Sequence, residues 1–260
     1  MYRTMLTDKR GGVISYVANR RGHRQQADLA ELAPGRSSDD AARALALECP
    51  GWYLSTLDPQ LAAAVGASGA TPTRHVHVMV ARTRPNPDSN EPSMPAGPGV
   101  AFRDFADFAW AEILPSWKAA YAPGHPDYEP GDDEDLIEAE LRPYVEREAL
   151  GPVHRSTTLA TIDGRVAGAI VISLRPEPVP FGGPWITEVW RDPASPTPGL
   201  GAALIGRALA MLCADGFETL GLAVTDGNPA RRVYEGLGFE PALESWTYLL
   251  PDSTSQAIRA

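Results

Sequence analysis

The residues best suited to chemistry lie at the start of a helix in the last third of the chain. Gly199-Leu200-Gly201 follows a break made of small and cyclic residues, Pro193–Pro198, and opens a segment with apolar residues at every third or fourth position. A glycine-containing turn lets backbone N–H groups point at one place, and the helix adds the positive end of its dipole. Such a turn binds an anion, most simply a phosphate or a pyrophosphate.

The elements around this turn form a strand–loop–helix–strand–helix unit. Strands are predicted at Trp185–Trp190 and Thr219–Val224, because β-branched and aromatic residues dominate the first and apolar residues the second. The helix after the turn is expected to stop at Gly216, and a second helix to run from about Asn228 to Gly238.

Two nucleotide-binding patterns do not fit this turn. A dinucleotide-binding fingerprint needs a third small residue three positions after Gly201, where this chain has Leu204. A Walker loop needs Gly-Lys-Ser/Thr at its end, and the turn has none. The anion is therefore expected to belong to another kind of ligand.

Two motifs of this unit resemble those of the GNAT acetyltransferase superfamily. The family's first motif, Arg/Gln-x-x-Gly-x-Gly/Ala at a helix start, falls on Pro196-Thr197-Pro198-Gly199-Leu200-Gly201. The second motif is an Asn after the fifth strand, then an Ala and a Tyr ahead of a Gly-Phe, and it falls on Asn228, Ala230, Tyr234 and Gly238-Phe239. Their separation and the strands between them strengthen the resemblance.

The resemblance implies a fold and a co-substrate. The fold would be α/β, a mixed central sheet flanked by helices, and the co-substrate acetyl-coenzyme A with its pyrophosphate on the Gly199–Gly201 turn. The residues expected to contact it, by backbone or side chain, are Trp190, Arg191, Thr197, Gly199, Leu200, Gly201, Ala202, Asn228 and Arg231. One departure stands out: Pro196 replaces the usual Arg or Gln, and Pro198 has no N–H, so the turn offers fewer donors than in relatives.

Acetyl transfer needs an amine nucleophile, a polarised thioester carbonyl and a proton for the leaving thiolate. From the resemblance, Glu188 is the predicted general base, directly or through water; the alternative is a surface or salt-bridged strand residue. Tyr234 is predicted to donate to the sulfur of coenzyme A. His125 and Asp127 lie in the loop Ala122–Pro130, which in this family borders the acceptor pocket, and are the predicted acceptor contacts.

A proline-, glycine- and serine-rich stretch at residues 84–99 is predicted to be a linker. It divides the chain into an N-terminal domain at 1–83 and an acetyl-CoA-binding domain at 100–260. RALALECPGWYLST (Arg43–Thr56) resembles RALAMLCADGFETLGLAV (Arg207–Val224), and the segment from Gly69 parallels that from Gly238. We interpret the N-terminal part as a truncated, degenerate GNAT-like copy, because it lacks the Gly-x-Gly turn and the Asn and Tyr of the second motif.

Further elements are predicted from pattern alone. In the first part we expect strands at Val13–Val17, Trp52–Thr56 and His75–Val80, and helices after Asp40 and at Pro59–Val65. In the second part we expect an aromatic-rich stretch that leads from Phe102 into a helix through Tyr121, and a hairpin around Asp163-Gly164. The basic residues Arg20, Arg21 and Arg24 are expected in a solvated loop.

Composition limits the function classes. A net charge of −10 argues against nucleic-acid binding and favours a cationic partner such as an amine. No run approaches membrane-spanning length, and Cys49 and Cys213 show no pairing or metal spacing, so a soluble cytoplasmic protein is expected. His75 and His77 share one face of a strand, but no carboxylate or cysteine is placed in the sequence to complete a site, and no metal is predicted.

The sequence therefore predicts an acetyl-CoA-dependent N-acetyltransferase acting on a primary amine of a small molecule or a protein. The alternative is a catalytically silent acyl-CoA-binding module whose N-terminal half binds a partner. The acceptor loops carry no diagnostic motif, and a homodimer is left open.

Overall fold

The computed structural model describes residues 2–21, 23–83, 99–128, 134–146, 149–176 and 182–252. The predicted linker lies outside these ranges apart from Gly99, as do the side chains of the acidic run at 132–135 and the tail from residue 253.

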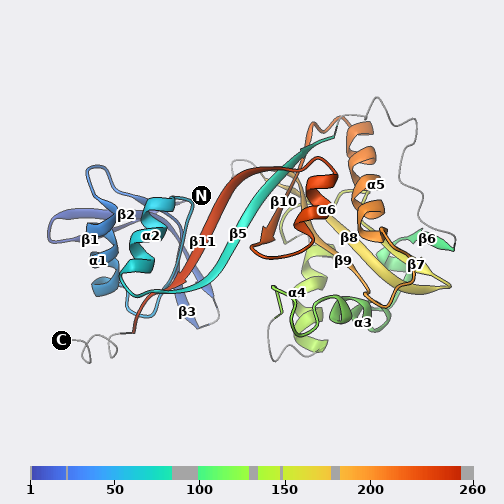
Figure 1. Ribbon diagram of the computed structural model, residues 1–260, viewed down its shortest axis with the longest axis horizontal. Helices are drawn as coiled ribbons and strands as arrows, with labels where there is room; N and C mark the ends of the chain where they lie inside the picture. Colours follow the sequence, from blue (N-terminus) through green and yellow to red (C-terminus); the bar gives the residue numbers. More distant parts are fainter. Residues whose placement is uncertain are drawn as a thin grey trace. The chain divides into compact units, whose positions relative to one another are not determined.

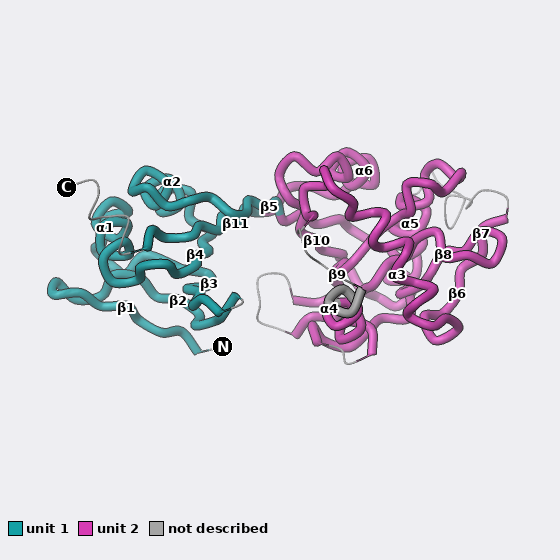
Figure 2. The backbone as a smooth tube through the Cα atoms, turned by 90° about the horizontal axis from the view of Figure 1, so that it is seen from below, with its two compact units in different colours: residues 1–77, 243–260 teal, residues 78–242 magenta. Residues whose placement is uncertain are grey.

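The chain divides into two compact units, coloured separately in Figure 2. Unit 1 comprises residues 1–77 and 243–260, and unit 2 comprises residues 78–242. Two long strands, β5 (Thr71–Arg82) and β11 (Glu240–Leu249), contribute residues to both units (Figure 1). Each unit thus contains residues from both sides of the predicted linker, and the assignment of coenzyme A binding to residues 100–260 stays a prediction.

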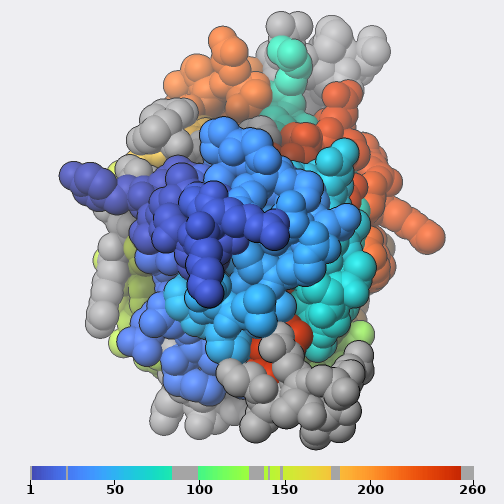
Figure 3. All heavy atoms as spheres, turned by 90° about the vertical axis from the view of Figure 1, so that its left-hand side faces the viewer, coloured from blue at the N-terminus to red at the C-terminus, as the bar shows by residue number. Residues whose placement is uncertain are grey.

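Unit 1 is a sheet with two helices. Its elements are β1 (Thr4–Asp8), β2 (Gly11–Arg21), β3 (Arg24–Leu32), α1 (Ser38–Glu48), β4 (Tyr53–Thr56), α2 (Pro59–Ala67) and the first part of β5. The strands follow the order β1-β2-β3-β4-β11-β5, with β3 and β4 parallel and β4 and β11 antiparallel. Leu45 of α1 and Leu61 of α2 pack on Leu54 of β4 in a core of fully buried side chains. Figure 3 shows the N-terminal residues in dark blue on the surface of unit 1, where Tyr2 is 99% exposed.

Unit 2 is a larger sheet covered on both faces. Its elements are β6 (Val100–Arg103), a 3-10 turn (Phe105–Asp107), α3 (Trp110–Ala120), α4 (Glu134–Glu146), β7 (Thr158–Ile162), β8 (Arg165–Arg175), β9 (Gly183–Arg191), α5 (Leu200–Ala214), β10 (Thr219–Thr225) and α6 (Arg231–Gly236). The strand order runs β11-β5-β10-β9-β8-β7-β6. The pairs β6–β7, β7–β8 and β8–β9 are antiparallel, and β10 is parallel to β9.

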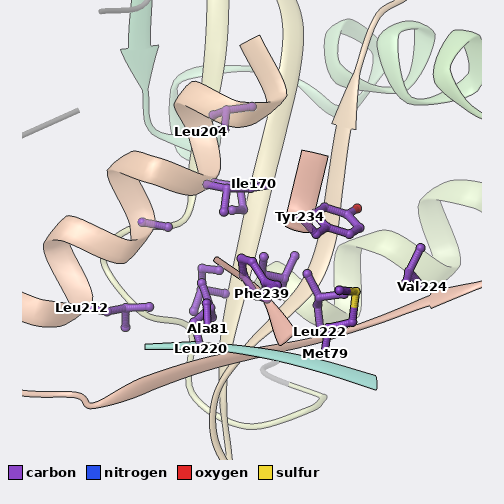
Figure 4. Packing of buried hydrophobic residues seen from close by; sticks show 14 of the residues in the cluster. Met79, Ala81, Ile170, Leu204, Leu212, Leu220, Leu222, Val224, Tyr234 and Phe239 are labelled. Carbon is purple, nitrogen blue, oxygen red and sulfur yellow. The ribbon is translucent and has the colours of Figure 1, made fainter. Parts of the chain in front are cut away.

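Alternate residues of β8 point to opposite faces of this sheet. Ile170 and Ile172 pack with Leu204 of α5 in one core cluster, part of which Figure 4 shows from close by. Val171 packs on the other face in a cluster with Ile113 of α3. This period-2 burial in a central strand places α5 on one face and α3 on the other.

The two parts of the chain repeat one order of elements. Three antiparallel strands, a helix, a parallel strand, a helix and a last strand occur as β1–β5 with α1 and α2, and again as β7–β11 with α5 and α6. The two copies exchange their last strands: β11 of the second copy lies next to β4, and β5 of the first copy lies next to β10. The expectation of a truncated N-terminal copy is confirmed, since unit 1 has no counterparts of α3 and α4 among its described residues.

Two local expectations are wrong, those for the basic stretch and for the start of the last helix. Arg20 and Arg21 lie in β2 and Arg24 begins β3, because this basic stretch is the end of a β-hairpin and not a loop; Arg21 lies over the ring of Tyr53 at 5.2 Å. The aromatic-rich stretch does lead into a helix as expected: Phe102 lies in β6, paired with Ala160, and α3 follows from Trp110. α6 starts at Arg231 and not at Asn228.

The C-terminal end of α5 is tied to the segment before β7 by charged hydrogen bonds. Asp215 accepts from His154 Nε2 at 2.9 Å and from Arg155 Nε and Nη2 at 2.7 Å each, and His154 Nδ1 lies 2.8 Å from Ser156 Oγ. The hydrogen bonds from Arg155, and then that from His154, lower the pKa of Asp215 to about 2. The Ser–His–Asp order resembles a nucleophilic triad, but Ser156 is 0% exposed and no substrate reaches it, so the cluster is structural.

We predict that Asp215 stabilises the fold only above acidic pH. Its folded pKa of about 2 lies below the ordinary value of about 3.9, so its contribution is present above pH about 4 and is lost as the pH falls towards 2. The difference in melting temperature between wild type and Asp215→Asn should be constant above pH about 5 and shrink between pH about 4 and 2. A difference that does not change with pH, or that also shrinks in the same window for the exposed control Asp39→Asn, would contradict this role.

Because strand segments are shared, we also predict that a chain cut at the linker stays together. Unit 2 contains Val78–Arg82 of β5, and unit 1 contains residues 243–249 of β11, so each unit is built from both fragments. A protease site inserted within residues 84–98 should give, after cleavage, one peak with the elution volume of the uncut chain in size-exclusion chromatography, and two fragments only in denaturant. Separation in native buffer would refute the exchange of strands.

Candidate active site

The parallel strands β9 and β10 are joined at one registered pair only, Gly221 with Trp185. On its other edge β9 pairs with β8 from Gly183 to Arg191, with a register shift next to Glu188. Within the described residues, the β10-facing edge of β9 beyond Trp185 therefore has no registered partner. Backbone N–H and C=O groups on this edge are available to a ligand that enters between the two strands.

The start of α5 presents unused backbone donors. Gly199 is the N-cap in the left-handed conformation (φ 77°), with no side-chain cap and no acidic residue in the first turn of the helix. Among the hydrogen bonds of the described residues, none takes its N–H from Gly199, Leu200, Gly201 or Ala202. A Cβ built on Gly201 would meet no atom within 4 Å. Packing within the protein therefore does not require a glycine at this position, and the space beside it is open. These amides and the helix dipole are suited to an anion, and the predicted pyrophosphate contact at this turn stays a prediction.

The corresponding helix start in unit 1 is already filled by the protein. Ser37 caps α1 by accepting from the N–H of Asp40 at 3.2 Å, and Asp39 and Asp40 occupy the first turn. Two carboxylates at this position repel an anion from the helix end. The parallel pair β3–β4 has three registered pairs instead of one, so unit 1 lacks both features of the site in unit 2.

On the α3 side of the sheet, two aromatic residues lead to the predicted base. Tyr121, at the end of α3, donates its hydroxyl to Glu188 Oε2 at 3.1 Å. The Tyr121 ring packs against Trp117 at 4.4 Å and against His125 edge to face at 4.8 Å. Burial first, and then the charge of Glu188, raises the pKa of Tyr121 well above its usual value. The phenol therefore remains a donor to this carboxylate at neutral pH.

A second carboxylate, Asp127, fixes the loop to the end of β10. It accepts from the hydroxyl of Thr225 and from Asn228 Nδ2, the latter at 3.3 Å. His125 Nδ1 lies 3.8 Å from Asp127 Oδ2 and accepts from the N–H of Asp127 at 3.1 Å. The two residues predicted from loop position alone thus contact one another and the second motif.

The charges of both carboxylates, Asp127 and Glu188, act on Tyr234. Its side chain is buried beside Phe239, with ring centroids 6.0 Å apart (Figure 4). Burial, followed by the negative charges of Asp127 and Glu188, raises its pKa to about 12. A phenol with this pKa keeps its proton at neutral pH and can donate a hydrogen bond to a thiolate.

Other predicted site residues have partners of their own. The Trp190 indole is 3% exposed and donates to Ser116 Oγ at 2.9 Å, so only its backbone can reach a ligand. Asn228 Oδ1 accepts from the N–H of Ala230 at 2.9 Å, which delays the start of α6. Arg231 pairs with Glu235 at 3.0 Å, and Arg191 is exposed. Thr197 N–H lies 3.5 Å from Ser195 Oγ, a long hydrogen bond.

Sequence reasoning missed three residues of this site. Tyr121 and Thr225 each bond a predicted carboxylate, and Trp117 packs on Tyr121. The indole N–H of Trp117 is buried, and within the described residues it has no hydrogen-bond partner. The spacing of Trp117 and Tyr121, four apart at the end of a helix next to the acceptor loop, was the available signal.

Comparisons with known proteins agree with this architecture. The acetyltransferase (GNAT) family profile matches residues 110–239, half of the chain. A mycothiol acetyltransferase of Thermomonospora curvata is 30% identical over 184 residues, which span 69% of this chain and 57% of that relative.

Solved structures show the same fold at low sequence identity. A GCN5-related N-acetyltransferase from Sphaerobacter thermophilus has a TM-score of 0.63 and 14% identity, with 94% of this chain and 78% of that one covered. A tandem GNAT protein from the clavulanic acid biosynthesis pathway has a TM-score of 0.58 and 17% identity, with 96% and 82% covered.

The chain belongs to the acetyltransferase (GNAT) family, with a degenerate GNAT-like N-terminal half. None of the helices in the described ranges combines the length and the apolar character that a membrane span requires.

We predict that Gly201→Glu abolishes most coenzyme A binding without disturbing the fold. The new side chain would enter open space and place a negative charge where the pyrophosphate is expected, while glutamate favours the helix more than glycine does. Calorimetry should show at least about tenfold weaker binding, equivalent to about 1.4 kcal/mol.

Gly206→Glu is the matched control for this prediction. Gly206 lies in the same helix and a Cβ there would also meet nothing within 4 Å, but it is more than one turn away from the N-terminal amides. Its affinity should stay within about twofold of wild type. Equal losses of coenzyme A affinity in both variants, or no loss in Gly201→Glu, would contradict the prediction that the pyrophosphate binds at the α5 turn.

Proposed function

We propose that unit 2 transfers the acetyl group of acetyl-CoA to a primary amine of a small cationic molecule. The observation that carries this proposal is a pair of carboxylates, Glu188 and Asp127, whose negative charges both act on Tyr234. Tyr121 holds the first by a hydrogen bond, and Thr225 and Asn228 hold the second. An ammonium group is attracted by such a pair of negative charges. The name of the Thermomonospora curvata relative, mycothiol acetyltransferase, also favours a small-molecule acceptor over a protein.

In this proposal the cofactor is held by backbone groups. The pyrophosphate lies on the amides of Gly199 to Ala202, which compensate in part for the donors that Pro196 and Pro198 lack. The pantetheine arm runs between β9 and β10, where the edge of β9 has no registered partner. A backbone N–H near Trp190 or Arg191 polarises the thioester carbonyl in the manner of an oxyanion hole. Thr197, Asn228 and Arg231 line the same cofactor path.

Glu188 removes a proton from the ammonium form of the acceptor, directly or through one water. The hydrogen bond from Tyr121 holds its carboxylate in place. The neutral amine then attacks the thioester carbon, the C–S bond breaks as the amide forms, and the proton that the amide nitrogen loses passes to the leaving thiolate. His125 and Asp127 hold the acceptor from the loop side, since both face the residues at the end of β10.

Tyr234 assists the departure of coenzyme A. Its phenol is protonated at neutral pH because burial and the two carboxylates raise its pKa to about 12. It therefore donates a hydrogen bond to the thiolate as the C–S bond breaks, and this stabilises the leaving group.

A silent acyl-CoA-binding module remains the second candidate. The observations in its favour are the two prolines of the anion turn and the Asn228 side chain, whose amide is already bonded to Asp127 and Ala230. The cytoplasmic location, the state of assembly and a partner for unit 1 stay predictions.

Thiol release from acetyl-CoA in the presence of a panel of small primary amines tests the proposal and separates the two candidates. We expect saturable release with at least one cationic small amine, and a lower rate with neutral amide or carboxylate analogues of the same size. Acetyl-CoA binding by calorimetry without release across the panel, including lysine-containing peptides, would favour the silent module. Release with peptides alone would replace the small acceptor by a protein.

Tyr234→Phe should separate turnover from binding. The change keeps the ring against Phe239 and removes only the hydroxyl donor. The hydrogen bond that is lost acts mainly in the transition state, so turnover should fall more than binding. We expect coenzyme A affinity within about threefold of wild type and a fall in turnover of roughly 10²-fold, the low end for general acid catalysis. Tyr53→Phe, in unit 1, is the control and should retain the wild-type rate. An unchanged rate in Tyr234→Phe would assign Tyr234 to packing alone.

A further inference from the structure

A chain of contacts joins the two carboxylates of the candidate active site by way of two aromatic rings. Glu188 accepts from the hydroxyl of Tyr121 at 3.1 Å, and the Tyr121 ring meets the His125 ring edge to face, with 4.8 Å between centroids. His125 Nδ1 in turn lies 3.8 Å from Asp127 Oδ2. All four residues belong to unit 2. A carboxylate therefore lies at each end of a short aromatic stretch.

The charge of Asp127 is held by neutral groups. Its carboxylate accepts from the hydroxyl of Thr225 and, at 3.3 Å, from the side-chain amide of Asn228. His125 Nδ1 accepts from the N–H of Asp127 at 3.1 Å, so this ring nitrogen carries no proton in that contact. Among the described residues, no lysine or arginine forms an ion pair with Asp127. A partly buried carboxylate in these surroundings is stabilised by a cation that a ligand brings.

The two carboxylates have different tasks in the proposed reaction. Glu188 takes a proton from the ammonium group that is to be acetylated, and its own charge is thereby neutralised. Asp127 receives no proton in this step and keeps its charge. Burial, and then the charges of the two carboxylates, raise the pKa of Tyr121 and of Tyr234, so both phenols stay neutral. An acceptor with a single ammonium group would thus leave Asp127 without a counter-charge.

The acceptor-loop end of the aromatic stretch is open to a small molecule. The side chains of His125 and Asp127 are 24% and 30% exposed. Aromatic rings attract ammonium groups, and the methylene groups of a cation pack along apolar surface. The order of carboxylate, aromatic rings and carboxylate in the protein therefore matches the order of ammonium, methylene chain and ammonium in a diamine.

We propose that the acceptor is a small diamine, of which one amino group is acetylated beside Glu188 while the other, as an ammonium group, pairs with Asp127. This inference rests on the proposed acetyl transfer to small amines and names the class of amine. The products are the monoacetylated diamine, the thiol of coenzyme A and one proton, which leaves from Glu188. Asp127 thereby determines specificity, and the net charge of −10 attracts a dication to the protein.

Thiol release with acceptors of matched length tests the inference on wild type. The probes are diaminopropane, diaminobutane and diaminopentane with an amino group at each end, each compared with the monoamine and the amino alcohol of the same length. For at least one diamine, kcat/KM should exceed that of its monoamine at least about tenfold, well above the roughly twofold advantage of two equivalent amino groups. The difference should lie mainly in KM, because the ion pair with Asp127 is present before and during the reaction.

Asp127→Asn removes the charge and keeps the size of the side chain and an oxygen that accepts from Thr225. The ratio of kcat/KM between diamine and monoamine should fall to roughly twofold in this variant. Glu218→Gln is the matched control, because it removes an exposed carboxylate just before β10 in the same unit, and it should keep the wild-type ratio.

The outcomes separate this inference from the proposed acetyl transfer. Equal kcat/KM for diamines and monoamines in wild type, or a preference for diamines that persists in Asp127→Asn, would overturn the diamine and leave the acetyl transfer standing. No thiol release with any of the amines would overturn both. If Asp127→Asn does not fold, the amino alcohols decide on wild type: they should react like the monoamines, and a rate equal to that of the diamines would contradict a second ion pair.

Discussion

The site depends on one constraint, the early separation of β9 from β10. The two strands meet at Trp185 and Gly221, and a Cβ on Gly221 would lie 2.6 Å from the Trp185 ring. Glycine is therefore required for this contact, and no further pair is registered after it. The irregular register of β9 with β8 next to Glu188 adds local twist, which turns the strand away from a flat sheet. In our proposal the extended thioester lies along this unregistered edge of β9, in a sheet that α5 and α3 cover from opposite faces.

The N-terminal copy shows what is lost when this constraint is absent. Its parallel strands β3 and β4 keep three registered pairs, and the hydroxyl of Ser55 bonds both the carboxylate of Asp28 and the N–H of Leu29 between them. Its helix start carries its own acids. The same order of elements therefore gives a closed sheet without an anion site. In our account unit 1 contributes strand pairing, and unit 2 contributes the chemistry.

The fold and the position of the glycine turn at the start of α5 could be predicted because their signals are local. Glycines at a helix start and an Asn–Tyr motif lie within short segments, and the repeated helix–strand order is visible in the sequence. The acceptor network could not be predicted, because Tyr121 and Glu188 are 67 residues apart and meet only once α3 lies on the sheet. The same holds for His75 and Glu244, 169 residues apart, which are brought together by a strand order that crosses the two copies.

The most direct test of the central claim is a coenzyme A titration followed by backbone amide NMR. If the pyrophosphate lies on the α5 turn and the pantetheine arm enters between β9 and β10, the amides of Gly199, Leu200, Gly201 and Ala202 should shift and saturate together with those of residues 188–191. The amides at the start of α1, residues 38–41, should not move. Shifts at α1 with none at α5, or saturable binding that leaves both strands unperturbed, would contradict the account.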